Sequence, residues 1–277
     1  MSTQDLNSSK LSKIIGIIYI VTSLLSMFCQ IFIFYVFKKD KKLLENTAHK
    51  LILFLSILEF TQQIPHFSGG ISSIMEKSIP TILERFFGSL LQASFMISFL
   101  TTLYLTLNRF YIFYKTIIIH FINQLLVQKI ATCITVSLSL SLFITYLFHD
   151  YGLNYDYISC TWNYIMDEDE PIPIYEFEYI FVLTILSISF IFYISIFLKI
   201  IYERNRNDST SKISFKSTDI RTLTHIITIY LFSVILEMLW WYNVDWFGNP
   251  ILADSFLNYA WLLYSGMNSF INIIFIR

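Results

Sequence analysis

Three ionisable side chains stand inside long hydrophobic stretches, and they are the residues whose chemistry demands an explanation. Arg109 lies in the segment Leu107-Asn108-Arg109-Phe110, while Glu59 and Glu237 interrupt two other apolar runs. An ionised group without a partner in hydrocarbon costs at least ~2.5 kcal/mol, so each must be paired, protonated or in contact with water. Side chains placed in this way suit electrostatic recognition, ligand contact or conformational switching.

The remaining reactive residue types form no cluster that predicts catalysis or metal binding. The three cysteines have no paired spacing, and neither a zinc site nor a disulfide framework is indicated. No basic stretch with interleaved aromatic residues predicts nucleic-acid binding. We therefore expect no enzyme, metal site, cofactor or nucleic-acid partner. The five histidines are scattered along the chain: His49, His66, His120, His149 and His225.

The composition predicts a membrane protein. Hydrophobic residues make up 55% of the 277 residues and charged residues only 14%, which is too few to cover a water-facing surface. A helix needs about 20 mostly apolar residues to cross a bilayer. The chain has seven such blocks, which predicts an all-α bundle of seven transmembrane helices. The expected spans are 13–37, 50–70, 84–113, 127–148, 177–202, 222–244 and 255–276.

The distribution of lysine and arginine predicts an N-terminus outside the cell and a C-terminus inside. With this orientation fifteen of the nineteen basic residues lie on the cytoplasmic side. The sequon Asn7-Ser8-Ser9 predicts glycosylation of Asn7 on the outer tail. We expect an extracellular tail over 1–12 and a helical domain over 13–276, in a multi-pass protein of the plasma membrane. The basic residues left outside are Lys10, Lys13, Lys77 and Arg85.

The segment Asn108-Arg109-Phe110 resembles the Asp/Glu-Arg-Tyr motif that ends the third helix of rhodopsin-like receptors. The Asn-Arg-Phe form is similar to that of the nematode serpentine chemoreceptors, with the Srx group as a first guess. The resemblance implies that Arg109 holds the inactive bundle closed and contacts a heterotrimeric G protein when the inner side opens. It also implies a sensory role. The alternative is that Arg109 is an anchor at the membrane interface.

The seventh span resembles the same family in part. Asn268-Ser269-Phe270-Ile271-Asn272 is similar to the Asn-Ser-x-x-Asn-Pro-x-x-Tyr region, but isoleucine replaces the proline and the tyrosine. Asn268 and Asn272 therefore act as switch residues or as interhelical hydrogen-bond partners, and either could pair with Glu59. The family's disulfide to the second outer loop is not expected, because Glu84 stands where the partner of Cys160 should lie.

In this architecture the ligand enters from outside between the third, fifth, sixth and seventh helices. The expected pocket is mostly aromatic and weakly polar, which suits small apolar or amphipathic molecules. Several of its tryptophans could equally belong to an aromatic belt at the membrane interface, and Glu237 could simply reach outward to water. The candidate ligand-binding residues are Gln92, Phe95, Met96, Phe99, Glu237, Trp240, Trp241, Trp261 and Tyr264.

A transporter or channel of small solutes is the alternative from another class. Transporters favour helices broken by glycine or proline, and only Pro65 and the pair Gly69-Gly70 hint at such a break. A seven-span channel would usually keep its N-terminus inside, against the charge bias. A retinal-binding opsin needs a lysine in the seventh span, and this span has none. The sequence thus favours a receptor.

Overall fold

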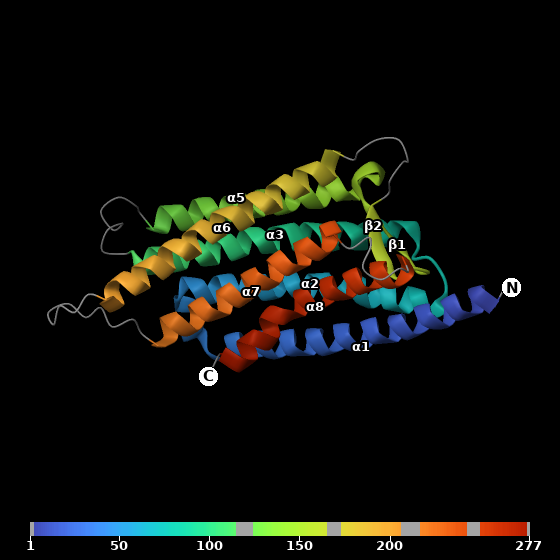
Figure 1. The fold of residues 1–277 in the computed structure, drawn as a ribbon, viewed down its shortest axis with the longest axis horizontal. Helices are drawn as coiled ribbons and strands as arrows, with labels where there is room; N and C mark the ends of the chain where they lie inside the picture. Colours follow the sequence, from blue (N-terminus) through green and yellow to red (C-terminus); the bar gives the residue numbers. More distant parts are fainter. Residues whose placement is uncertain (1–2, 115–123, 165–172, 206–216, 243–249, 276–277) are drawn as a thin grey trace.

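Over the residues that it describes, a computed structural model of the chain contains seven long helices, which confirms the prediction of a seven-helix bundle (Figure 1). It describes residues 3–114, 124–164, 173–205, 217–242 and 250–275. Each helix includes or overlaps one of the predicted hydrophobic blocks and extends beyond most of them by a few residues. The helices are α1 (Thr3–Lys39), α2 (Thr47–Met75), α3 (Thr81–Phe113), α5 (Gln124–Leu147), α6 (Pro173–Asn205), α7 (Ser217–Tyr242) and α8 (Pro250–Phe275).

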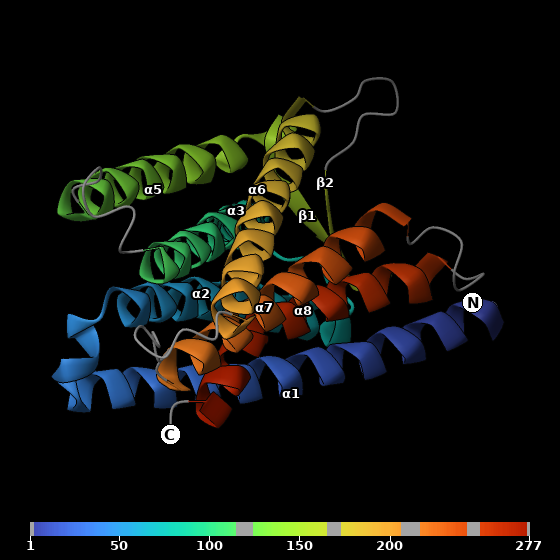
Figure 2. The same ribbon diagram turned by 60° about the vertical axis from the view of Figure 1, so that its left-hand side comes forward.

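Helix α3 lies in the middle of the bundle and packs against α2, α5, α6 and α7 (Figures 1 and 2). Helix α1 packs against α2 and α8 on the other side, and α8 also contacts α2 and α7. Nearly every residue from Leu91 to Thr106 of α3 is buried. A helix that is buried all round serves as the axis of the bundle, so residues at both of its ends are held by several neighbours.

Five of the described helices are long and apolar enough to cross a membrane by length and composition: α1, α3, α5, α6 and α7. Helices α2 and α8 fall short of this criterion because they carry most of the buried amide side chains of the described residues. Many apolar residues of α6 face outward, as in Phe190, Ile191 and Phe197. Such a surface suits lipid, and the buried amides suit a bundle interior in which polar groups pair across helices.

The glycines of α2 allow close packing and do not interrupt the helix. A Cβ on Gly70 would lie 2.8 Å from the carbonyl oxygen of Gly16, and a Cβ on Gly69 would lie 2.6 Å from the ring of Tyr155. Helix α2 continues through Pro65 to Met75. The pair Gly69-Gly70 is thus explained by contacts with α1 and with Tyr155, and the hint of a transporter-like broken helix disappears.

The segment between α5 and α6 contains an antiparallel hairpin that the sequence analysis did not predict. Its strands are β1 (Leu153–Asp156) and β2 (Thr161–Tyr164), with Leu153 opposite Tyr164 and Asp156 opposite Thr161. A short 3-10 helix, His149–Tyr151, precedes it, and another, Lys41–Glu45, joins α1 to α2. The hairpin lies at the same end of the bundle as the N-terminus, which we call the hairpin end (Figure 1). The opposite end, where α3 finishes after Arg109, is the arginine end.

Helix α1 begins at Thr3, whereas the hydrophobic block begins at residue 13. The sequon at Asn7 therefore lies on a helical backbone, although the side chain of Asn7 is outside the described part of the structure. Glycosylation acceptors are normally surface loops. The outer placement of the tail and the modification of Asn7 remain predictions.

Candidate functional site

The hairpin is anchored to α3 at the position where the sequence analysis looked for a disulfide. The backbone N–H of Tyr155 donates to Oε1 of Glu84 over 3.0 Å. Nearby, a Cβ on Gly88 would lie only 2.6 Å from the carbonyl oxygen of Leu153, so strand β1 passes directly over this glycine. All three cysteines, which lie among the described residues, are free thiols. A hydrogen bond and close backbone packing thus anchor the hairpin where the receptor family would place a disulfide, which the sequence analysis did not expect.

The turn of the hairpin is held by α1 and α8 through the carbonyl oxygen of Cys160. The hydroxyl of Tyr19 lies 2.9 Å from this oxygen, and Nδ2 of Asn258 donates to it over 3.1 Å. Cys160 has a backbone φ of 56°, which is unfavourable for a residue with a side chain and is maintained by these contacts. Burial raises the pKa of the Cys160 thiol, so the protonated and unreactive form predominates near neutral pH.

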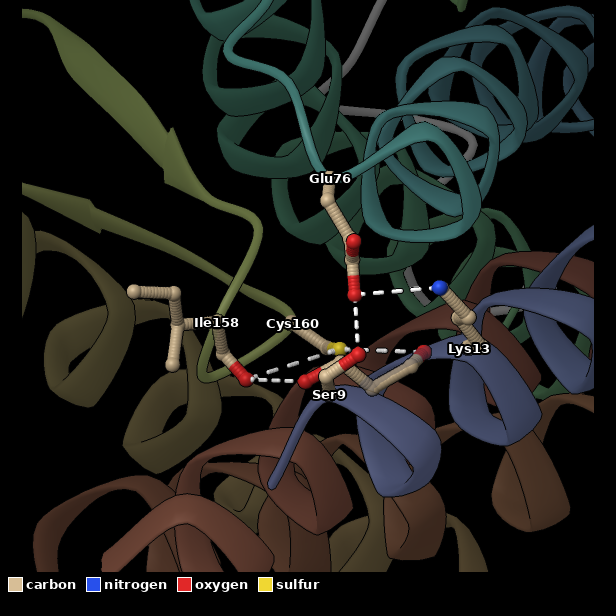
Figure 3. A network of polar contacts seen from close by, with 6 residues as sticks. Ser9, Lys13, Glu76, Ile158 and Cys160 are labelled. Carbon is tan, nitrogen blue, oxygen red and sulfur yellow. Dashed lines mark hydrogen bonds and ion pairs between the residues drawn. The ribbon is translucent and has the colours of Figure 1, made fainter. Parts of the chain in front are cut away.

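A second set of polar contacts joins the first turns of α1 to the end of α2 and to the hairpin (Figure 3). Ser9 donates a hydrogen bond to Glu76, and Nζ of Lys13 lies 3.1 Å from the same carboxylate. The hydroxyl of Ser12 donates to the carbonyl oxygen of Ile158 over 2.7 Å. The bond from Ser9, followed by the contact with Lys13, holds the pKa of Glu76 below its usual range. Three segments distant in sequence therefore meet at the hairpin end.

A cavity of about 30 Å³ lies beneath the hairpin, between α3, α6, α7 and α8. This volume holds one or two water molecules, so a larger ligand requires side chains to move. The buried residues Phe95, Met96 and Trp261 form part of its wall, while Tyr175 and Trp240 are partly exposed. The complete lining is Gln92, Phe95, Met96, Tyr164, Tyr175, Glu178, Val182, Leu236, Glu237, Trp240 and Trp261.

The most elaborate polar group at the cavity is Glu178, which the sequence analysis missed. Its side chain is 7% exposed and accepts hydrogen bonds from the hydroxyls of Tyr146 and Tyr164. Nε2 of Gln92 donates to the same carboxylate over 2.6 Å. Helices α3, α5 and α6 and the hairpin are thereby joined at one carboxylate. The position of Glu178, second in the block 177–202, made it look like a boundary residue in the sequence.

Six of the nine predicted ligand-binding residues line this cavity: Gln92, Phe95, Met96, Glu237, Trp240 and Trp261. Trp261 is buried against Phe95 and His66, so the interpretation as an interface belt residue is wrong for it. Phe99 and Tyr264 stack on each other with ring centroids 6.1 Å apart and are not part of the lining. The side chain of Trp241 lies outside the described residues.

At the arginine end, Arg109 is 2% exposed and faces the bundle. Its charge acts on both His49 and His225, so these three side chains lie near one another. A guanidinium buried to this extent is more than an anchor at the membrane interface. Among the described residues the side-chain oxygen of Asn108 accepts no hydrogen bond, so it does not serve as the acceptor in a local lock with Arg109.

The predicted switch residues of α2 and α8 form one network with α7. Nε2 of His225 lies 3.1 Å from Oδ1 of Asn268, and Nδ2 of Asn272 donates to the same oxygen over 3.0 Å. Nδ2 of Asn268 donates to Ser56 over 3.1 Å, and Glu59 interacts with Asn268 as well. Sequence reasoning missed the role of His225, which was one of five scattered histidines.

Phe110, the third member of the Asn-Arg-Phe segment, connects α3 to α6 at the arginine end. Its ring stacks on Tyr114 at 4.5 Å and tilts against Phe192 at 4.8 Å. One turn before Arg109, the hydroxyls of Thr106 and Tyr193 are 2.7 Å apart. The segment therefore lies in a packed junction of α3 with α6, and Arg109 turns toward α7 and α2.

Between the two ends, α2 and α8 are joined by amide side chains. Nε2 of Gln63 donates to Oγ of Ser265 over 2.6 Å, and Nε1 of Trp261 lies 3.3 Å from Oε1 of Gln62. Gln30 of α1 donates to the carbonyl oxygen of Ser265 over 3.1 Å. The polar residues that weaken α2 and α8 as membrane spans thus pair with each other inside the bundle.

Comparison with known proteins supports the fold. No protein-family model matches the sequence, and a search of curated proteins finds no match either. Solved structures do match, and one of them is a crystal structure of squid rhodopsin. That match has a TM-score of 0.66 and 14% sequence identity, and it covers 95% of this chain and 77% of the rhodopsin chain. The apolar helices and this likeness indicate a multi-pass membrane protein with the rhodopsin-type arrangement of seven helices.

Proposed function

We propose that this protein is a G-protein-coupled receptor with a chemosensory role. The observation that carries the proposal is the rhodopsin-type bundle with a covered cavity at the hairpin end and a buried arginine at the other end of the same central helix. A small apolar or amphipathic molecule binds the cavity from outside. Its binding favours a bundle conformation whose cytoplasmic mouth accepts a heterotrimeric G protein, which is a shift of populations.

The proposal assigns the hairpin end to the extracellular side of the plasma membrane. The distribution of lysine and arginine supports this orientation, as the sequence analysis described. The mostly aromatic walls of the cavity support a ligand with apolar surface. Gln92, Phe95, Met96, Glu237, Trp240 and Trp261 contact it. Arg109, with His225 and Asn268 behind it, holds the inner mouth closed, and Asn108 and Phe110 border the G-protein contact.

The test combines topology with coupling in intact cells. Epitopes at the two ends should show an exposed N-terminus and a hidden C-terminus. Arg109→Ala should change basal or ligand-stimulated G-protein activation while surface expression persists. Lys41→Ala is the matched control, since it removes an exposed positive charge at the arginine end. Unchanged coupling in a normally expressed Arg109→Ala variant would remove Arg109 from the mechanism. A cytoplasmic N-terminus would refute the receptor proposal.

A further inference from the structure

The lining of the cavity beneath the hairpin is acidic as well as aromatic. Two of its lining residues, Glu178 on α6 and Glu237 on α7, carry carboxyl groups. Among the described residues that line the cavity there is no lysine, arginine or histidine. Two tyrosines and a glutamine donate hydrogen bonds to the carboxyl group of Glu178, and none of them supplies a positive charge.

The hydrogen-bonding capacity of Glu178 is not exhausted by its neighbours. Tyr146 donates to Oε1, while Tyr164 and Gln92 donate to Oε2. A carboxylate offers about four acceptor positions, so three donors leave room for one more. The three donors also fix the orientation of the carboxylate, which lowers the entropic cost of binding a further donor.

The rest of the lining suits a cation better than an anion. Phe95, Trp240 and Trp261 gather their rings at the cavity, with Trp240 and Trp261 at 5.7 Å and Phe95 and Trp261 at 4.9 Å between centroids. Aromatic faces attract ammonium groups. A cavity that holds one or two water molecules can accommodate an ammonium head group, and the partly exposed Tyr175 and Trp240 can move aside for the rest of a ligand.

A metal ion is a poorer occupant of this cavity. No group of three or more histidine, cysteine, aspartate or glutamate side chains suitable for a metal occurs among the described residues. Two carboxylates on separate helices, with tyrosine hydroxyls already bonded to one of them, leave too few oxygen ligands for a hard cation such as Ca²⁺. An organic ammonium needs only one acceptor and aromatic contact.

We propose that the cavity binds a protonated amine, with Glu178 as the main acceptor for its ammonium group and Glu237 contributing charge from the facing helix. The inference rests on the proposed receptor function, since it names the class of ligand for the same site. The sequence analysis placed Glu237 among the candidate ligand-binding residues and did not include Glu178. Tyr164 of the hairpin donates to the same carboxylate as the ligand, so the amine binds next to the hairpin.

The test is a binding measurement on the purified full-length chain, and it needs no G protein. Phenethylamine is compared with 2-phenylethanol, which has nearly the same shape without the charge, up to millimolar concentrations at neutral pH. The amine should bind about 10- to 100-fold more tightly, the range expected for a hydrogen bond to a charged group. Glu178→Gln should abolish this preference. Glu176→Gln, an exposed carboxylate on the same helix, should leave it intact.

Equal binding of the amine and the alcohol to the unaltered protein, or no binding of either, would overturn the inference whatever the variants do. An undiminished preference in Glu178→Gln would overturn it as well. If Glu178→Gln does not fold, Glu237→Gln should still reduce the preference. Absence of the preference in the unaltered protein, alongside coupling that depends on Arg109, rejects the amine and leaves the receptor. Amine binding without such coupling rejects the receptor and leaves the amine site.

Discussion

Replacing Gly88 by alanine should release the hairpin from the bundle. The new Cβ would lie 2.6 Å from the carbonyl oxygen of Leu153 and 3.1 Å from its Cβ. The first of these contacts is with backbone, so strand β1 itself must shift. Overpacking of this kind typically costs about 1–3 kcal/mol. Alanine also stabilises a helix by about 1 kcal/mol relative to glycine. That gain belongs to α3 whether the hairpin is closed or open, so it does not protect the hairpin.

The two terms separate in experiment. The free energy of global unfolding includes both the clash and the helix propensity of alanine, so Gly88→Ala should lower it by only about 0–2 kcal/mol. The free energy of hairpin opening is changed by the clash alone, so the population with an open hairpin should rise about 5- to 150-fold. The buried thiol of Cys160 reports this opening, because alkylation requires exposure. The measurement is the rate of Cys160 alkylation in a background in which Cys29 and Cys133 are replaced by serine.

The control for this measurement is Ile82→Ala on the same helix, whose side chain is 85% exposed. It should leave the alkylation rate of Cys160 close to that of the parent. A Gly88→Ala protein that alkylates at the parent rate would refute the reasoning, since it would mean that β1 does not press on α3. If the increase in alkylation rate is no larger than the loss of global stability predicts, the substitution destabilises the whole bundle and not the hairpin specifically.

Three further predictions concern the contacts around the hairpin. The bond from Ser9 lowers the pKa of Glu76, so the ionised carboxylate stabilises the folded state at pH values above the unfolded pKa near 4.5. This stabilisation should be lost as the pH falls through the lower pKa of the folded state. Glu76→Gln should remove this dependence of thermal stability on pH. Tyr19→Phe should cost about 0.5–1.5 kcal/mol and speed alkylation of Cys160. Glu84→Ala should weaken hairpin closure by about 1–2 kcal/mol, again seen in that alkylation rate.

The helices were predictable because their signal is local. Long apolar runs identify each span without any knowledge of its neighbours, and the place of Arg109 in such a run singles it out as a residue that needs a partner or water. Pairing of Glu59 with Asn268 or Asn272 was also anticipated, since polar residues cannot face lipid, and the structure has Glu59 interacting with Asn268. These inferences need only the nature of the bilayer.

The hairpin and the role of Glu178 depend on contacts between distant segments. Two strands of four residues carry too weak an alternation to be recognised, and the anchors of the hairpin lie on five helices, α1, α2, α3, α6 and α8. Glu178 gains its meaning from Tyr146, Tyr164 and Gln92, of which Gln92 is 86 positions away. From sequence alone, a carboxylate near the end of a span is expected to contact water, and its burial depends on segments that are distant in the sequence. His225 was missed for the same reason.

Helix α8 connects the two ends of the bundle, and this leads to a last prediction. Trp261 lines the cavity, and Ser265, Asn268 and Asn272 follow it at helical spacing on the buried face. A packed face that contacts both sites is a physical route for coupling, although contact alone does not establish it. Asn268→Ala removes the partner of His225 and Asn272 without touching the cavity.

If both ends bias one equilibrium, this substitution must change the affinity of phenethylamine for the cavity, by about 5-fold or more in either direction. Thr228→Ala on α7 is the control, because its hydroxyl bonds only within its own helix. A common change in both variants would indicate a general effect of destabilisation. An affinity unchanged by Asn268→Ala would show that the asparagines only hold helices together. A change confined to Asn268→Ala would establish the asparagines as part of the switch. Coupling is reciprocal, so if the asparagine network alters ligand affinity, ligand binding must also alter the equilibrium of that network.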